Sequence, residues 1–509
     1  MFLIRPVRVK SHIVFAKKNQ ELHMKVNLMS NLLAFALISM AVFTISNSTA
    51  SEIKAENFIA KLKTYYQKTR LIKSFSMTHN YLYLGQDRSY SSWDYQAPNQ
   101  YTAFKITEFD LEKQHYVESV VHNFPGGRKL DEVHFKNDTE SFRYEKKGVP
   151  YGKRLVRQSL DDYEGFKNLI VVNIDFLALR PLLEEKDVEE KIELFQDKVS
   201  RKTTLIHSTT NDAVVEYVFD NESLRLLSLN NKAKRRIYYY DDYQTTNEIA
   251  FARSIVQYTN GATTPTFIKH IDRFDIQERI ASTKLQIPQG YGPVIPKRDR
   301  TLVSKKIAPD LYLVTDSSSW RNILFKVIGD EIMVFGAPIS PKLAEQTIKL
   351  IHSQFPKKEI TSVYVTHPHS DHIAGLSVYA KLGVVIRADT YSIAAIKTYP
   401  PFIEHAIKFK FQTIEHDKVI DGVHFYVLEN THSKLQSFAY FKDSGIIYQA
   451  DFLEVAFDNT IAKVLPSYTK PFIDFVRTKQ LTINRIVGHH SNNNISVDVM
   501  NRTYDVKLM

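Results

Sequence analysis

Four side chains of the types that bind metal ions lie close together in the C-terminal half of the chain. The segment Thr366–Gly375 reads THPHSDHIAG, and its metal-binding types are His367, His369, Asp371 and His372. In extended backbone alternate residues point the same way, so the first two histidines can reach one ion. The aspartate and the last histidine begin a predicted helix and can face a second ion. Imidazole and carboxylate ligands in this pattern suit zinc.

Three further residues of these types each follow a short apolar run that predicts a strand. The residues are His432, Asp451 and His489, and the runs are Val423–Leu428, Ile446–Gln449 and Arg485–Val487. The ends of such strands collect along one edge of a layered sheet, where sites form, so we expect all seven side chains to meet there. His490 competes with His489 for its role, and we favour His489 because it directly follows Gly488.

Predicted strands and helices alternate around these residues in the range 301–509. The strand-like runs are Leu311–Val314, Ile323–Val327, Glu331–Phe335 and Ile360–Val365, and the helix-like segments are Pro341–Phe355 and Ile373–Leu382. This alternation favours a layered α/β domain.

With these motifs in this order, the C-terminal half resembles the metallo-β-lactamase-fold hydrolase superfamily, in its glyoxalase-II-like and lactonase-like binuclear zinc branch. The resemblance covers about Ile307–Arg502 and implies an αβ/βα sandwich with a metal site at one edge. It implies that one zinc is bound by His367, His369 and His432. It implies that a second zinc is bound by Asp371, His372 and His489, and that Asp451 bridges both.

The same resemblance implies an activity and two catalytic residues. A hydroxide shared by the two zinc ions would attack an ester, thioester, lactone or phosphodiester-type bond of a small-molecule substrate. Asp451 would hold both ions, and Asp371 would also steer protons. A bridging aspartate is typical of thioesterases, lactonases and phosphodiesterases, whereas zinc β-lactamases with a cysteine at this position are excluded because the chain has no cysteine.

One position departs from the pattern of the relatives. Many of them carry an aspartate after the strand equivalent to Ile332–Phe335, where this chain has Gly336. That aspartate supports the site without binding the metal, so we expect metal affinity to be weaker or differently tuned here.

Two alternatives remain open. Persulfide dioxygenases of the same superfamily share the His-x-His-x-Asp-His loop and use one iron ion, which would make the protein an oxidoreductase. A non-enzymatic protein could instead bind a lipid, glycan or partner protein through residues 51–300.

Residues 51–300 are predicted to form a β-rich domain, a curved antiparallel sheet with helices. Runs of β-forming residues alternate with turn signals, as at Ser74–Leu84 and Tyr101–Phe109. Glu52–Lys68 and Asp175–Val188 have helical character. The segment Ile287–Thr301 is rich in proline, glycine and charge, which indicates a boundary to the domain at 301–509.

Residues 1–50 are predicted to be a signal peptide with a basic extension. Lys25 precedes the apolar stretch Leu32–Ile45, and small residues lead to a cleavage site after Ala50. We expect Met24 to be the natural start and the mature protein to be periplasmic or secreted, the alternative being an uncleaved anchor in the inner membrane. After processing, no stable membrane span is expected.

The charge of the chain argues against nucleic-acid binding. The formal net charge is +11, of which residues 1–50 carry +5, so little positive charge remains for the other 459 residues. These charges form no basic stripe interleaved with aromatic residues, so no nucleic-acid partner is expected. The sequence does not indicate an oligomeric state.

Overall fold

The computed structural model describes residues 55–84, 101–124, 127–147, 151–209, 213–259, 261–295, 301–316, 321–404 and 408–506. Residues 55–509 form one compact unit. The predicted signal peptide at 1–50 lies outside the described residues. Within the described ranges, every helix is too short or too polar to cross a bilayer.

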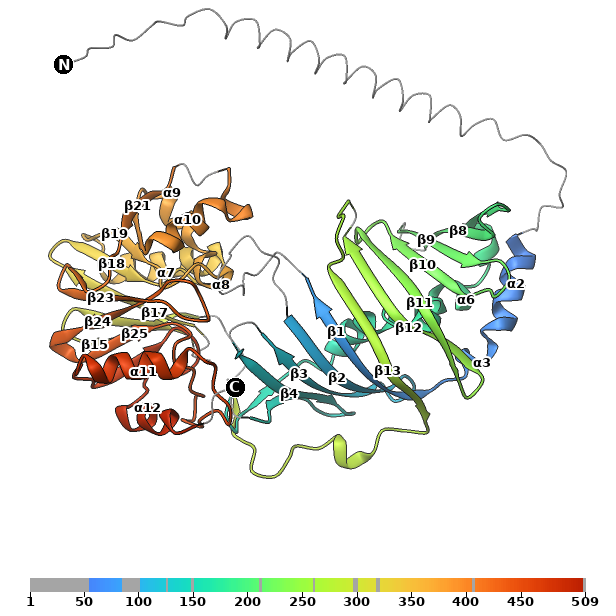
Figure 1. Cartoon of the computed structure of the whole chain (residues 1–509), viewed down its shortest axis with the longest axis horizontal. Helices are drawn as coiled ribbons and strands as arrows, with labels where there is room; N and C mark the ends of the chain where they lie inside the picture. The colour runs from blue at the N-terminus through green and yellow to red at the C-terminus, as the bar shows by residue number, and fades with distance from the viewer. Residues whose placement is uncertain are drawn as a thin grey trace, which may run out of the picture. The chain divides into compact units, whose positions relative to one another are not determined.

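A fourteen-stranded sheet occupies the first part of this unit (Figure 1). Its strands are β1 (Ser74–Tyr83), β2 (Tyr101–Asp110), β3 (His115–Asn123), β4 (Lys129–Lys136), β5 (Ser141–Glu145), β6 (Leu155–Arg157), β7 (Ile192–Asp197), β8 (Lys202–Ser208), β9 (Val214–Asp220), β10 (Leu226–Asn231), β11 (Arg236–Thr246), β12 (Ile249–Thr259), β13 (Phe267–Gln277) and β14 (Val294–Ile295). The order is β14-β6-β5-β4-β3-β2-β1-β13-β12-β11-β10-β9-β8-β7. Of the pairings along this order, the one between β14 and β6 is parallel, and the rest are antiparallel, as expected from the sequence.

Five helices accompany this sheet: α2 (Ala55–Tyr65), α3 (Gln67–Arg70), α4 (Asp162–Val171), α5 (Asp175–Ala178) and α6 (Arg180–Glu184). An aromatic contact joins α2 to the sheet, since the ring centroids of Phe58 in α2 and Phe219 in β9 are 5.7 Å apart. The expectation of one helix over Asp175–Val188 is wrong, because the segment divides into α5 and α6. Pro181 lies in the first turn of α6 and has no N–H to continue the hydrogen bonds of a helix from α5.

The second part of the unit contains two further sheets. A seven-stranded sheet runs in sequence order through β15 (Val303–Ala308), β16 (Leu311–Thr315), β17 (Asn322–Ile328), β18 (Glu331–Phe335), β19 (Glu359–Tyr364), β20 (Val385–Ala388) and β21 (Lys410–Thr413). A five-stranded sheet consists of β22 (Lys418–Ile420), β23 (Val423–Leu428), β24 (Gln436–Phe441), β25 (Ile446–Gln449) and β26 (Arg485–Gly488). Strands β18 to β21 are parallel, as are β25 and β26.

These two sheets pack face to face, because their strands carry apolar side chains on both faces. In β18, Met333 and Phe335 join a buried cluster with Tyr364 of β19 and Tyr448 of β25. The intervening Val334 belongs to a different cluster on the other face of the sheet. Successive side chains of a strand point to opposite faces, so the continuous apolar run Ile332–Phe335 is the pattern of a strand covered on both sides.

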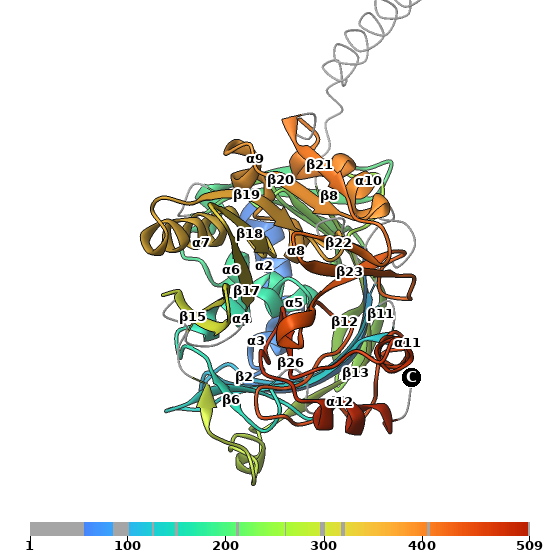
Figure 2. The ribbon, with the colours of Figure 1, turned by 90° about the vertical axis from the view of Figure 1, so that its left-hand side faces the viewer.

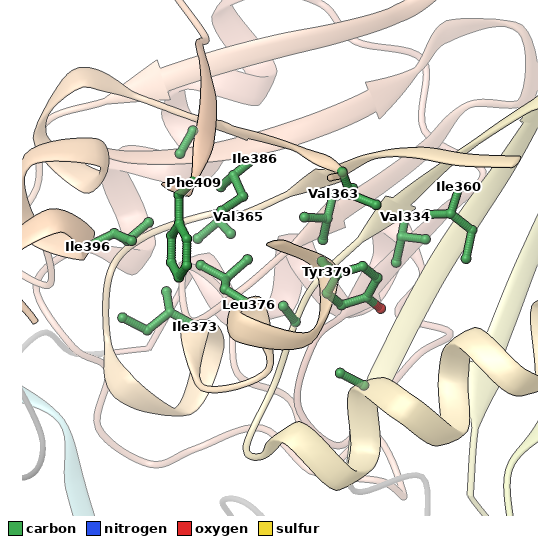
Figure 3. Packing of buried hydrophobic residues seen from close by; sticks show 14 of the residues in the cluster. Val334, Ile360, Val363, Val365, Ile373, Leu376, Tyr379, Ile386, Ile396 and Phe409 are labelled. Carbon is green, nitrogen blue, oxygen red and sulfur yellow. The ribbon is translucent and has the colours of Figure 1, made fainter. Parts of the chain in front are cut away.

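Helices cover the outer face of each sheet. They are α7 (Pro341–Gln354), α8 (Ser370–Ile373), α9 (Leu376–Lys381) and α10 (Thr390–Thr398) over the seven-stranded sheet, and α11 (Thr469–Thr478) and α12 (Val497–Tyr504) over the five-stranded sheet. Figure 2 shows α9 and α10 beside β19 to β21. In Figure 3, Leu376 lies between Ile373 and the strand residue Val363, and all three belong to the buried cluster that joins the helical layer to the sheet. The layers follow one another as helix, sheet, sheet and helix, as in the expected αβ/βα sandwich.

Two expectations about this region have different outcomes. The single helix over Ile373–Leu382 is wrong in its bounds, because α8 ends at Ile373 and α9 begins at Leu376. The strands of the first sheet all precede residue 296, and those of the other two sheets all follow residue 302. The division into two domains at about residue 300 stays a prediction.

Candidate metal centre

The first two histidines of the THPHSDHIAG segment lie in the loop between β19 and α8. His367 is fully buried and His369 is 3% exposed. His369 has extended backbone angles (φ −63°, ψ 144°) and is the N-cap residue of α8. The centroids of the two imidazole rings are 4.5 Å apart. The extended loop therefore turns both rings to the same side, as the alternation predicted.

The loop after β23 brings His432 to the same place. Asn430 shapes this loop, because its Oδ1 accepts hydrogen bonds from the backbone N–H groups of His432 (2.7 Å) and Ser433 (3.0 Å). The ring of His432 then lies against His367, with 3.2 Å between the two Nε2 atoms.

Asp451 lies at the centre of the cluster, directly after β25. Its Oδ2 is 3.3 Å from His367 Nε2, 3.1 Å from His432 Nε2 and 2.9 Å from His372 Nε2. Its Oδ1 is 3.0 Å from His490 Nε2. The residue has a left-handed backbone (φ 62°), a conformation that aspartate adopts more readily than most residues. One carboxylate thus contacts imidazoles from three loops and from α8.

Two adjacent histidines after β26 complete the cluster. His489 is 1% exposed, and its Nδ1 lies 2.7 Å from the hydroxyl oxygen of Tyr448. Its Nε2 has no hydrogen-bond partner among the described residues. His490 points its Nδ1 to the guanidinium of Arg321, and its Nε2 lies 3.2 Å from His372 Nε2.

The potential ligand atoms form two groups, each with its atoms within 4.8 Å of one another. The first consists of His367, His369, His432 and Asp451, and the second consists of His372, His489 and His490. The structure therefore places His489 and His490 together beside His372. The roles of these residues as ligands stay predictions.

Asp371 lies beside the second group without belonging to it. Its Oδ2 is 3.6 Å from His490 Nε2 and 3.2 Å from Arg321 Nη2, and its Oδ1 is 3.6 Å from His372 Nε2. Its side chain is 27% exposed, against 7% for Asp451. Asp371 is therefore the more accessible of the two carboxylates.

At His367, His369 and His489 the electrostatics of the cluster favour neutral imidazoles, beside an ionised carboxylate at Asp451. Burial lowers the pKa of His367 to about 3 and holds the pKa values of His369 and His489 well below the usual value. Burial would raise the pKa of Asp451, but His490 and His372 beside it hold that pKa well below its usual range. Neutral imidazole nitrogens and ionised carboxylate oxygens are the forms that bind a metal ion.

The same balance acts on the neighbours of these groups. For Asp371, His372, His490 and Arg321 outweigh burial and hold the carboxyl pKa well below its usual range. Burial lowers the pKa of His372, but the two carboxylates, Asp371 and Asp451, outweigh it and raise that pKa. Burial also raises the pKa of the Tyr448 phenol, which therefore keeps its proton at neutral pH.

The donor set of the first group fits a divalent metal ion. Three imidazoles and one carboxylate converge, all are less than 8% exposed, and Zn–N bonds of about 2.0–2.1 Å would place such ligands around one ion. Buried imidazoles with Nε2 atoms at 3.2 Å, as in His367 and His432, are the arrangement expected of ligands to a shared cation. The second group offers three imidazoles, with Asp451 shared between the groups.

Two residues that lie close to the cluster in the sequence have different positions. Tyr448 contacts His489, as described, whereas Lys434 is exposed on the loop after His432.

Sequence reasoning missed Arg321, which precedes β17 and contacts both Asp371 and His490. A single arginine before a strand gives no signal of such a role, because its two partners lie 50 and 169 residues away. It also missed Asn430, for which an asparagine two residues before a histidine was an available signal of a turn.

Comparisons with known proteins extend this description. No protein-family model matches the chain. A linear primary-alkylsulfatase from a Pseudomonas species is 36% identical over 80 residues, which are 15% of this chain and only 11% of the relative.

Similar solved structures include three metallo-β-lactamases. They are DIM-1 (13% identity, 40% of this chain and 96% of that one, TM-score 0.30), an enzyme from Erythrobacter litoralis (14%, 41% and 97%, TM-score 0.32) and FIM-1 from Pseudomonas aeruginosa in its mono-zinc form (14%, 41% and 96%, TM-score 0.34). The predicted resemblance to metallo-β-lactamase-fold proteins recurs in this comparison, and the glyoxalase-II-like and lactonase-like branch stays a prediction. The resemblance concerns the fold of about 40% of the chain.

Proposed function

We propose that this chain is a metal-dependent hydrolase that binds two zinc ions at the edge of its αβ/βα sandwich. The observation that carries the proposal is the position of Asp451 between two groups of buried imidazoles. Such a carboxylate can be shared by two ions, with His367, His369 and His432 on one side and His372 and His489 on the other.

The residues around the ions would have different roles in hydrolysis. Two zinc ions supply Lewis acidity and lower the pKa of water, so that water becomes a nucleophile at neutral pH. Asp451 would fix the spacing of the two ions. Asp371, which is the more accessible carboxylate, would accept and pass on a proton, and the Arg321 guanidinium holds it in place.

The proposed substrate class is the one that the motif resemblance implies. We propose that the site acts on an ester, a thioester, a lactone or a phosphodiester-type bond in a small molecule. The relative named as an alkylsulfatase adds a sulfate ester to this range. We therefore propose a substrate with a polarised carbonyl, phosphoryl or sulfuryl centre.

The test is metal analysis of the purified full chain, followed by a panel of substrates. We expect about two zinc equivalents and turnover of at least one of five probes: a carboxylic ester, a thioester, a lactone, a phosphodiester and an alkyl sulfate. Chelation should abolish the turnover and zinc should restore it. Protein that binds no metal, or turnover that is indifferent to chelation, would refute the proposal.

Two further results would identify the alternatives. One iron equivalent with oxygen uptake on a persulfide would identify a dioxygenase. A phenotype that survives His367→Ala but is lost with residues 51–300 would identify a binding protein.

We also propose that the mature protein is exported to the periplasm or secreted. The support for this is the signal-like pattern of residues 1–50.

A further inference from the structure

The hydroxyl group of Tyr448 occupies a fixed position between two strands of the sandwich. Its ring is fully buried in β25 and makes edge-to-face contacts with Phe335 (6.2 Å between ring centroids) and Tyr364 (6.5 Å). β25 itself lies between β24 and β26. The ring therefore has no room to adopt another orientation.

Gly336 makes room for this hydroxyl. The glycine follows β18 with φ at +102°, and a Cβ atom there would lie 2.4 Å from the Tyr448 oxygen. It would also lie 3.3 Å from the Cε1 and Nδ1 atoms of His489. Any side chain at this position would displace either the phenol or the imidazole, so Gly336 and Tyr448 form a matched pair.

The hydroxyl has two polar neighbours, and their chemistry sets the direction of each hydrogen bond. One is the backbone carbonyl oxygen of Asn322 at 3.4 Å, which can only accept, so a hydrogen bond between these two groups uses the phenol proton. The other is His489 Nδ1 at 2.7 Å. Once the phenol proton points to the carbonyl, Nδ1 carries a proton and donates it to the phenol oxygen.

The backbone around His489 is held from the same side. Asn322 N–H donates to the carbonyl of His489 (2.8 Å), and Asn322 Nδ2 donates to the carbonyls of Gly488 (2.8 Å) and Ser491 (3.2 Å). These bonds hold the backbone of His489, whose imidazole lies beside those of His372 and His490.

In His490 the proton lies on the other ring nitrogen. Arg321 can only donate, so His490 Nδ1 accepts its hydrogen bond. In the neutral ring the proton then lies on Nε2, 3.0 Å from Asp451 Oδ1. Of the two adjacent histidines, His489 presents a lone pair and His490 presents an N–H group.

We propose that Tyr448 is a positioning residue whose phenol oxygen accepts the Nδ1–H of His489, so that the Nε2 lone pair of this imidazole faces the ion shared with His372. This inference rests on the proposed function, since it needs a metal ion at the second group. Tyr448 acts through His489 and does not touch the ion itself. Outer hydrogen bonds of this kind fix the tautomer and orientation of a ligating histidine.

The test compares Tyr448→Phe with Tyr364→Phe in the full chain. Tyr364 is a matched control, because it is also fully buried in the same cluster and its hydroxyl bonds to Ser437 Oγ (2.9 Å) away from the second group. Zinc affinity is measured by competition with a chelator. We expect Tyr448→Phe to lower the affinity for one of the two zinc ions by about 10- to 100-fold and to leave the affinity for the other unchanged. Tyr364→Phe should bind both ions as the unsubstituted protein does.

A second measurement reports the tautomer of His489 in the unsubstituted protein. Nitrogen NMR of histidine-labelled, metal-free protein, with His489 assigned by its absence in His489→Gln, should show Nδ1 protonated and Nε2 unprotonated. The opposite tautomer, or a Tyr448→Phe protein that keeps both zinc affinities, would overturn the inference. An unsubstituted protein that binds no zinc would instead overturn the proposed function.

Discussion

At the scale of single residues, Asp451 combines a functional position with an unusual backbone. Its φ of 62° lies in the left-handed region, and its two oxygens contact Nε2 atoms of four histidines. Asparagine adopts this conformation about as readily as aspartate. The role of the charge can therefore be separated from the role of the backbone.

We expect Asp451→Asn to fold but to bind zinc much more weakly, because it removes the negative charge that the two ions would share. Metal content should fall below one equivalent, and hydrolysis should fall by roughly 100-fold or more. Metal analysis and initial rates measure both effects. Asp310→Asn is the matched control, because Asp310 has a similar backbone (φ 54°) in an exposed turn. If Asp451→Asn kept two ions, Asp451 would not bridge them.

The sequence located the residues of the site but not the contacts that orient them. His367 to His372 could be found because they lie in one short segment with metal-ligand types, and His432, Asp451 and His489 because each follows a predicted strand. Tyr448 could not be given a role from the sequence, since its contact with His489 depends on the parallel pairing of β25 with β26. Gly336 was interpreted as a loss of support, whereas the structure fills its space with the Tyr448 hydroxyl.

At the scale of elements, the contact between α7 and the start of α9 depends on Gly375. A Cβ atom there would lie 3.0 Å from the Cβ of Ala344 and 3.1 Å from the carbonyl oxygen of Ala337. The Gly375 N–H also donates to that carbonyl (3.0 Å). This close approach accompanies the break between α8 and α9, which hydrophobic periodicity alone did not reveal.

We expect Gly375→Ala to destabilise the protein by about 1–3 kcal/mol, because the added methyl group overpacks this contact. Ala344→Gly should restore part of the loss, while the contact with the Ala337 backbone remains. Denaturant unfolding measures the change. Gly165→Ala is the control, because Gly165 lies within α4 with no atom within 4 Å of the added Cβ, so that variant should be slightly more stable. Equal effects of the two substitutions would contradict the packing argument.

The first turn of α10 gives a pH-dependent prediction. Asp389 is the N-cap residue, accepts a hydrogen bond from Ser392 N–H (2.8 Å) and is 1% exposed. Burial raises the pKa of its carboxyl group from 3.8 to about 6. The folded state therefore holds a proton that the unfolded state has released between these values, and this contribution to stability is lost as the pH rises through about 6.

Asparagine also caps helices but stays neutral at every pH. Asp389→Asn should match the unsubstituted protein near pH 4 and exceed its unfolding free energy by roughly 2–3 kcal/mol at pH 8. Asp389→Ala should be less stable than Asp389→Asn by about 1 kcal/mol at both pH values, because the cap is lost. Urea unfolding at the two pH values measures these differences. If the unfolding free energies of Asp389→Asn and the unsubstituted protein differed by the same amount at both pH values, the carboxyl group would not be protonated in the folded state.

At the scale of the whole molecule, export makes a prediction about the N-terminus. Protein purified from the periplasm or medium of a bacterial host should begin at Ser51, because the small residues before it are typical of a signal-peptidase site. Ala50→Arg should block cleavage and keep the chain with the membrane fraction. N-terminal sequencing and intact mass give the result. An unprocessed chain in the cytoplasm would contradict export.

The metal centre also connects the two sheets of the sandwich. His367 and His369 follow β19 of the seven-stranded sheet, whereas His432, Asp451 and His489 follow strands of the five-stranded sheet. Ions held between these loops would bind the folded state and not the unfolded chain, so they should raise stability by about 4 kcal/mol when zinc is at about 1,000 times its dissociation constant.

We therefore expect chelation to lower the calorimetric midpoint by several degrees and added zinc to reverse the change. The midpoint of Asp451→Asn should respond much less, because that variant holds little metal in either condition. If chelation lowered the midpoint of both proteins equally, the chelator would be acting elsewhere. If it changed neither midpoint, the ions would not stabilise the contact between the two sheets.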